Sequence, residues 1–141
     1  MIVYVDTSVL LKLILEEEGS ERAALVWDAA DVVASASLVV VEARAALAAA
    51  LRGRRITPAQ HRAAKRELVD LVDQLAIVAV TDRLVAQAAD LAEDEALRGY
   101  DALHLAAAIT VEAQVVASAD AELCAAAERR RLHVANPIGD R

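Results

Sequence analysis

The stretch Ile2-Val-Tyr-Val-Asp6-Thr-Ser8 decides how the rest of the chain is interpreted. Residues 2–5 are apolar and β-forming, and an aspartate and two hydroxyl residues follow them, which is a pattern that favours a turn and the start of a helix. Residues 9–18 then have a helical composition. The stretch therefore predicts a strand that leads directly into a helix, with Asp6 at the carboxyl end of the strand.

The same order of strand and helix repeats along the chain. Further strands are expected at 32–34, 77–80, 115–117 and 132–134, the last of them at an edge, and helices at 20–30, 38–52, 58–74, 83–97, 101–112 and 121–131. Gly53 and Gly99 are expected to follow the ends of two of these helices. The alternation predicts an α/β fold, a three-layer α/β/α sandwich with a central, mostly parallel sheet of four to five strands.

Length and composition favour one domain over residues 1–141. Hydrophobic residues make up 57% of the 141 residues, which excludes general disorder. The chain has no run of eighteen uncharged apolar residues and no positively charged start, so neither a membrane span nor a signal peptide is expected. Cys124 is the single cysteine, which excludes an internal disulfide and favours a reducing cytoplasm.

The charges are unevenly distributed. A formal net charge of −7 argues against a protein that coats nucleic acid by bulk charge. Residues 52–66, however, contain no acid and form a basic island, in which the candidate RNA-contacting residues are Arg52, Arg54, Arg55, Arg62, Lys65 and Arg66. With two tyrosines, one tryptophan and no phenylalanine, RNA binding would depend on phosphate contacts and shape. A solvated face, or pairing with acids of a protein partner, explains the island equally well.

Four acids occupy positions that suit a shared site. In open parallel sheets, ligands bind beyond the carboxyl ends of the strands. Asp6 directly follows the first strand, Asp120 comes three residues after the strand at 115–117, and Asp101 lies in the first turn of a helix. Glu42 lies about one turn into an apolar helical stretch, where an unpaired carboxylate is costly.

If these four acids meet, their repulsion requires a cation. Two carboxylates about 4 Å apart repel by roughly 4 kcal/mol at an effective dielectric constant near 20. Mg²⁺ and Mn²⁺ prefer hard oxygen ligands, and a metal-activated water can attack a phosphodiester in line. The alternative is that the three aspartates only cap helices and that Glu42 is an exposed helical residue.

Five segments together resemble the PIN domain family, and within it the VapC-type toxins of bacterial toxin–antitoxin pairs. The first is Met1-Ile-Val-Tyr-Val-Asp-Thr-Ser-Val-Leu10, and the second is Val40-Val-Glu42-Ala-Arg44. The most specific is Gly99-Tyr-Asp101-Ala-Leu-His-Leu-Ala-Ala107, followed by residues 115–123 and the closing segment 132–137. The order of the segments and the chain length are also similar to those of the family.

The resemblance implies a Mg²⁺- or Mn²⁺-dependent endoribonuclease, with a cognate VapB-type antitoxin and a homodimeric state. In that reading Asp6, Glu42, Asp101 and Asp120 bind metal or orient the attacking water. Ser8 and Ser118 position carboxylates through hydrogen bonds. The RNA substrate is a transfer, ribosomal or messenger RNA.

Two alternative functions, and the role of His104, are also considered. A Mg²⁺-dependent phosphatase or phosphotransferase with Asp6 as nucleophile would gain support from an acid two residues later, where Ser8 stands. A catalytically inactive α/β interaction module would not need all four acids. His104, one turn after Asp101, is either a packed neighbour of the site or a proton shuttle.

Overall fold

The apolar runs expected as strands form one sheet in the computed structural model, which describes residues 1–139. Its strands are β1 (Ile2–Val5), β2 (Val32–Ala36), β3 (Ala76–Val78), β4 (Val115–Ala117) and β5 (His133–Ala135). All neighbouring pairs are parallel, in the order β3-β2-β1-β4-β5. The two strands that precede Asp6 and Asp120, β1 and β4, are therefore adjacent, with β1 at the centre of the sheet.

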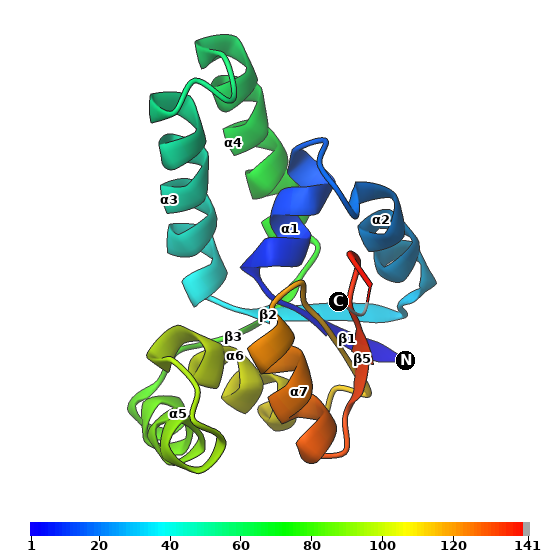
Figure 1. The fold of residues 1–141 in the computed structure, drawn as a ribbon, viewed down its shortest axis with the longest axis vertical. Helices are drawn as coiled ribbons and strands as arrows, with labels where there is room; N and C mark the ends of the chain where they lie inside the picture. The colour runs from blue at the N-terminus through cyan, green and yellow to red at the C-terminus, as the bar shows by residue number, and fades with distance from the viewer. Residues whose placement is uncertain (140–141) are drawn as a thin grey trace.

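Helices cover both faces of this sheet, and the predicted three-layer α/β/α fold is confirmed (Figure 1). One face carries α1–α4 and the other carries α5–α7. The helices are α1 (Thr7–Ile14), α2 (Ser20–Ala29), α3 (Leu38–Arg52), α4 (Pro58–Asp73), α5 (Asp82–Glu95), α6 (Gly99–Thr110) and α7 (Ala121–Arg129). Among residues 1–139, no helix is both long and apolar enough to span a membrane.

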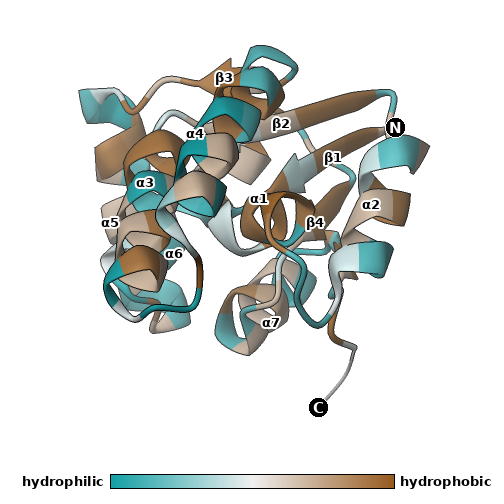
Figure 2. Cartoon of the chain, turned by 90° about the horizontal axis from the view of Figure 1, so that it is seen from above, coloured by the Kyte–Doolittle hydropathy of each residue, from teal (hydrophilic) through white to brown (hydrophobic). Residues whose placement is uncertain are grey.

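The sheet separates two hydrophobic clusters, and the side chains of β1 contribute to both. Val3 and Val5 are fully buried among residues of the α1–α4 layer, whereas Tyr4 is fully buried among residues of α5, α6 and α7. Apolar residues accordingly dominate the strands in Figure 2. Because successive side chains of a strand point to opposite faces, this alternation places the Tyr4 hydroxyl group on the side of the sheet where α6 packs.

Helices α3 and α4 form a hairpin that projects away from the sheet (Figure 1). Gly53 follows α3 as expected, and Thr57 begins α4 with a capping box in which Thr57 and Gln60 bond each other's backbone N–H. The predicted basic island therefore occupies the hairpin tip and the first turns of α4.

The first helix is shorter than predicted. It was expected over 9–18, but α1 begins at Thr7 because the Asp6 side chain caps its first turn. It ends before Leu15, whose carbonyl oxygen accepts a hydrogen bond from Ser20 Oγ. This serine stabilises the turn between α1 and α2, so residues 16–18 lie outside the helix.

Other predicted boundaries differ by one to three residues. Gly99 was expected to follow the end of a helix, but α5 ends at Glu95, the next residue Ala96 adopts the left-handed conformation with φ of 52°, and Gly99 is the first residue of α6. Strand β3 starts one residue earlier and ends two earlier than expected, and β5 is shifted by one residue. Both are edge strands, where a neighbour on only one side fixes the boundaries less tightly.

Candidate active site

The four predicted acids meet at the carboxyl ends of β1 and β4. Ser118 connects two of them, since its Oγ donates to Asp6 Oδ2 at 2.5 Å and accepts from the backbone N–H of Asp120 at 2.9 Å. The Arg98 guanidinium lies between Asp101 and Asp120, and Thr7, the residue after Asp6, donates a hydrogen bond to Glu42. The neighbouring strands thus bring together acids that lie more than a hundred residues apart in sequence.

Asp6 lies deepest, with 5% of its surface exposed. Its Oδ1 accepts from Ser8 Oγ at 2.5 Å and from the Val9 backbone N–H at 3.3 Å, while Oδ2 accepts from Ser118 Oγ. Burial raises the pKa of Asp6 above its ordinary value, and the nearby His104 and the two serines offset only part of this effect. Capping of α1 and a role in the site are therefore compatible, and the hydrogen bonds expected of Ser8 and Ser118 are present.

Asp120 also combines two roles. Its Oδ1 caps α7 by accepting from the backbone N–H groups of Glu122 at 2.9 Å and Leu123 at 3.0 Å. Its Oδ2 faces Arg98, with 3.3 Å between Oδ2 and the guanidinium Nη2. One carboxylate oxygen thus anchors the helix and the other points to the shared site.

Asp101 has an unsatisfied carboxylate oxygen. Among the described residues, its Oδ2 is buried without a hydrogen-bond partner, and the Arg98 Nε lies 3.5 Å away. Burial raises the pKa of Asp101, and the negative charges of Asp120 and Asp6 raise it further, while Arg98 and His104 oppose the shift. A buried anionic oxygen without a partner is costly, and a bound cation would remove that cost.

Glu42 is held by residues from two other elements. Its Oε1 accepts from Thr7 Oγ1 and from His104 Nε2, both at 2.7 Å. Partial burial raises the pKa of Glu42, but the hydrogen bonds from His104 and Thr7 outweigh it and hold the pKa below its usual value. Glu42 is therefore not a solvated helical residue, and its carboxylate is kept ionised.

Sequence reasoning missed the buried hydrogen-bond chain that reaches Glu42 from the core. The Tyr4 hydroxyl oxygen accepts from the Ala36 backbone N–H at 3.1 Å, and the hydroxyl group is hydrogen-bonded to His104 Nδ1 at 2.7 Å. Because an ionised carboxylate can only accept, His104 Nε2 is the donor to Glu42, and the ring is buried with 3% exposed. His104 is thus a packed residue that orients Glu42. A tyrosine among strand valines was the available signal, because a buried hydroxyl group requires a partner.

Substitution of Tyr4 by Phe should destabilise the protein. It removes a hydroxyl group that satisfies both the Ala36 N–H and His104 Nδ1, so we expect a loss of about 1–3 kcal/mol in the free energy of unfolding. Urea denaturation measures this loss. Tyr100→Phe is the matched control, because the Tyr100 side chain is 63% exposed, and equal effects of the two substitutions would contradict the chain of hydrogen bonds.

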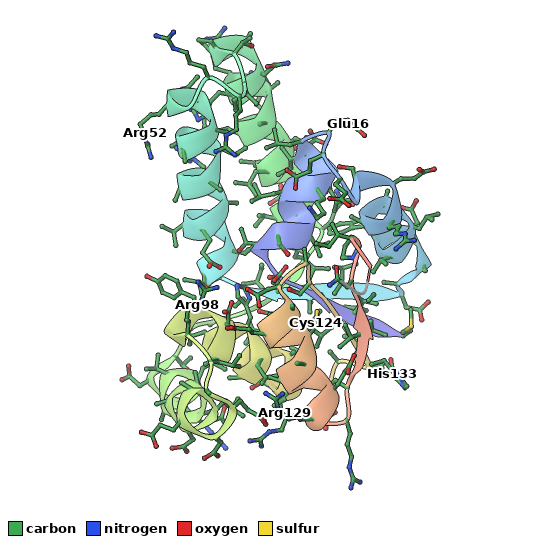
Figure 3. The ribbon with its side chains drawn as sticks, in the orientation of Figure 1. Glu16, Arg52, Arg98, Cys124, Arg129 and His133 are labelled. Atoms are coloured by element: carbon green, nitrogen blue, oxygen red, sulfur yellow. The ribbon has the colours of Figure 1, made fainter. Side chains whose placement is uncertain are left out.

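Two adjoining hollows open onto the acids. The first is lined by Glu42, Arg98, Gly99, Tyr100 and Asp101, and the second by Arg98, Ala119, Asp120, Ala121 and Glu122. A larger hollow between β3, α5 and α6 contains none of the four acids. Figure 3 shows Arg98 beside the start of α3, whereas Arg52 lies at the opposite end of that helix.

The donor set suits Mg²⁺ or Mn²⁺, because it consists of carboxylate oxygens and includes the unpartnered Asp101 Oδ2. Within residues 1–139, however, no three acids, histidines or cysteines are already arranged so that they could hold a metal ion. In place of a metal ion, the Arg98 guanidinium lies between Asp101 and Asp120, and Glu42 Oε1 is hydrogen-bonded to His104. The residues fit a divalent cation in chemistry, and Arg98 has to move aside for one to bind.

Comparison with known proteins identifies the family of this chain. The PIN domain family pattern matches residues 3–129. The chain belongs to the PIN domain family. Two curated relatives, Ribonuclease VapC45 and Ribonuclease VapC49 from two strains of Mycobacterium tuberculosis, are each 39% identical over 132 residues, which cover 94% of this chain and 87% of the relative. The resemblance to VapC-type proteins is therefore confirmed.

Solved structures share the fold of this PIN domain. FitAcB from Neisseria gonorrhoeae superposes with a TM-score of 0.73 at 21% identity, covering 97% of this chain and 98% of that chain. VapC20 from Mycobacterium tuberculosis, described as a sarcin–ricin loop cleaving toxin, gives a TM-score of 0.69 at 24% identity, covering 88% and 94%. At these identities the structures support the fold and do not identify the substrate.

Proposed function

We propose that this PIN domain is a Mg²⁺- or Mn²⁺-dependent endoribonuclease, the toxin of a VapBC-type toxin–antitoxin pair. The relatives named as VapC ribonucleases support the nuclease class, since their similarity covers nearly the whole chain. The observation that carries the proposal is the buried Asp101 Oδ2, which faces the other acids without a hydrogen-bond partner among the described residues. A site with this excess of negative charge binds a divalent cation in preference to an organic anion.

The four acids would have different roles in hydrolysis. Asp6, Asp101 and Asp120 would hold the cation, with Asp6 fixed by Ser8 and Ser118. A bound divalent ion supplies an activated water and offsets negative charge on the phosphate.

Glu42 would orient and deprotonate the attacking water. Its Oε1 is occupied by Thr7 and His104, so Oε2 is the oxygen available to accept that proton. The hydrogen bonds from His104 and Thr7 hold the pKa of Glu42 below its usual value, so the carboxylate is ionised at neutral pH and able to accept a proton.

The basic island would contact RNA at a distance from the cleavage site. Ten residues of helix α3 separate Glu42 from Arg52, which corresponds to about 15 Å along the helix axis. None of residues 52–66 lines the two hollows that open onto the acids, so these residues would hold flanking phosphates of a folded transfer, ribosomal or messenger RNA. Three of them, Arg62, Lys65 and Arg66, line a shallow hollow with Arg44 and Val69.

A VapB-type antitoxin and a second copy of this chain are the proposed protein partners, in the cytoplasm. Structures that share the fold include toxin–antitoxin complexes, among them VapBC2 from Rickettsia felis bound to promoter DNA, with a TM-score of 0.66 at 17% identity over 96% of this chain and 98% of that chain. If the toxin reading is correct, expression of the chain alone arrests growth, and co-expression of the small neighbouring gene relieves the arrest.

The experiment that tests the nuclease is incubation of the purified protein with total cellular RNA and Mg²⁺ or Mn²⁺. We expect discrete fragments on a denaturing gel, complete loss of cleavage when EDTA removes the metal, and recovery when Mn²⁺ is added in excess. Cleavage that persists in EDTA would contradict the metal-dependent mechanism. Absence of cleavage with either metal would contradict the nuclease.

A further inference from the structure

Arg98 is the cation at the mouth of the site. It is the residue before α6, and its carbonyl oxygen accepts from the Ala102 backbone N–H at 2.9 Å, which fixes its backbone beside the first turn of that helix. Its side chain pairs with Asp101 and with Asp120. Among residues 1–139, Arg98 is the one Lys or Arg that lines either of the two hollows that open onto the acids.

These ion pairs hold the guanidinium only loosely. The Arg98 side chain is 77% exposed, and its distances to Asp101 Oδ2 and Asp120 Oδ2 are 3.5 and 3.3 Å. Exposed ion pairs of this kind contribute little to stability, and the Asp101 pair does not satisfy the hydrogen-bonding capacity of Oδ2. The guanidinium is therefore free to leave the acids at small cost if a better cation replaces it.

We propose that Arg98 is the phosphate-binding residue of the cleavage site: it pairs with Asp101 and Asp120 in the resting protein and turns to an RNA phosphate when a divalent cation occupies these carboxylates. This inference rests on the proposed nuclease function and names the residue that binds the substrate next to the acids. A planar guanidinium donates two parallel hydrogen bonds to a phosphate, which an ammonium group cannot reproduce.

The position of Arg98 also resolves an electrostatic conflict. Four carboxylates repel an anionic RNA backbone, and none of residues 52–66, the basic island, lines the two hollows that open onto these acids. Arg98 immediately precedes α6, and Asp101 lies in the first turn of that helix, so the guanidinium and the third acid are held close to each other by the local backbone. A released Arg98 would place a positive charge at the opening through which the phosphate enters.

The test compares Arg98→Gln and Arg98→Lys with the wild type and with Arg83→Gln, an exposed arginine in the first turn of α5. Binding of a fluorescein-labelled, 12-nucleotide single-stranded RNA of mixed sequence is measured by anisotropy with Ca²⁺ in place of Mg²⁺, and a gel verifies that the probe stays intact. Binding of Mn²⁺ alone is measured from the electron paramagnetic resonance signal of the free ion. Cleavage kinetics in Mg²⁺ complete the set.

We expect Arg98→Gln to weaken RNA binding about tenfold, as loss of one charge-assisted contact does, and to act mainly on KM. Mn²⁺ binding should become about threefold tighter, because the competing cation is gone. Arg98→Lys should fall between wild type and Arg98→Gln, and Arg83→Gln should match the wild type.

Weaker Mn²⁺ binding by Arg98→Gln would overturn the proposal, since Arg98 would then arrange the carboxylates. RNA binding equal to that of Arg83→Gln, with an active wild type, would overturn it and leave the nuclease intact. A wild type that binds Mn²⁺ but neither binds nor cleaves RNA would overturn both the proposal and the nuclease.

Discussion

Substitution of Asp6 by Asn is expected to lower RNA cleavage by roughly a thousandfold while the protein remains folded. Asp6 is the most buried of the four acids and receives hydrogen bonds from Ser8 and Ser118 at 2.5 Å each. Asparagine has nearly the same shape and keeps one oxygen acceptor, but it removes the negative charge that attracts the metal. Activity is measured on total RNA in Mg²⁺, and folding by far-ultraviolet circular dichroism.

Two comparisons make this result specific. Asp73→Asn, at the exposed end of α4, is the matched control and should retain wild-type activity. Mg²⁺ should raise the melting temperature of the wild type and of this control, but not that of Asp6→Asn, because the substitution removes a ligand. Cleavage by Asp6→Asn within a factor of three of wild type would show that the site has been misplaced.

Substitution of Asp101 by Asn is expected to lower activity at least a hundredfold and to raise the stability of the metal-free protein. Its Oδ2 is buried without a hydrogen-bond partner among residues 1–139, and burial together with the charges of Asp120 and Asp6 raises its pKa. An uncharged amide relieves this repulsion. At pH 8 we expect an increase of about 1 kcal/mol in the free energy of unfolding, or about 3 °C in melting temperature.

The pH dependence follows from the direction of the pKa shift. Because the folded protein holds the Asp101 proton more tightly than the unfolded chain does, the stability that Asp101 contributes is fully present below the unfolded-state pKa of about 4 and is lost as pH rises through the higher folded value. The advantage of Asp101→Asn should therefore be present at pH 8 and vanish at pH 3.5. Thermal unfolding in EDTA across this range measures it.

Two controls test whether the stabilisation comes from relief of repulsion at Asp101 and not from the loss of any surface acid. Asp28→Asn, on the exposed side of α2, should leave the melting temperature unchanged at both pH values. Excess Mg²⁺ should stabilise the wild type more than Asp101→Asn and so reduce or reverse the difference. A destabilised Asp101→Asn in EDTA at pH 8 would contradict the repulsion that we infer.

The amino-acid sequence determined the order of the elements and the local placement of the acids. Apolar runs of a few residues predicted β1 and β4, so Asp6 and Asp120 could be assigned to strand ends. Capping residues act within three or four positions, and Thr57 began α4 as predicted. Errors arose at boundaries such as Ser20, where a side chain from the next helix stabilises the end of α1.

The tertiary structure alone decided which of these residues meet. Strand order places β1 beside β4, and this pairing allows Ser118 to join Asp6 and Asp120. The contact of His104 with both Tyr4 and Glu42, and the position of Arg98 between two acids, depend on how α6 packs against β1 and α3. Local propensities cannot specify such contacts, because they join residues up to 112 positions apart and exist only when the two helical layers have packed on the sheet.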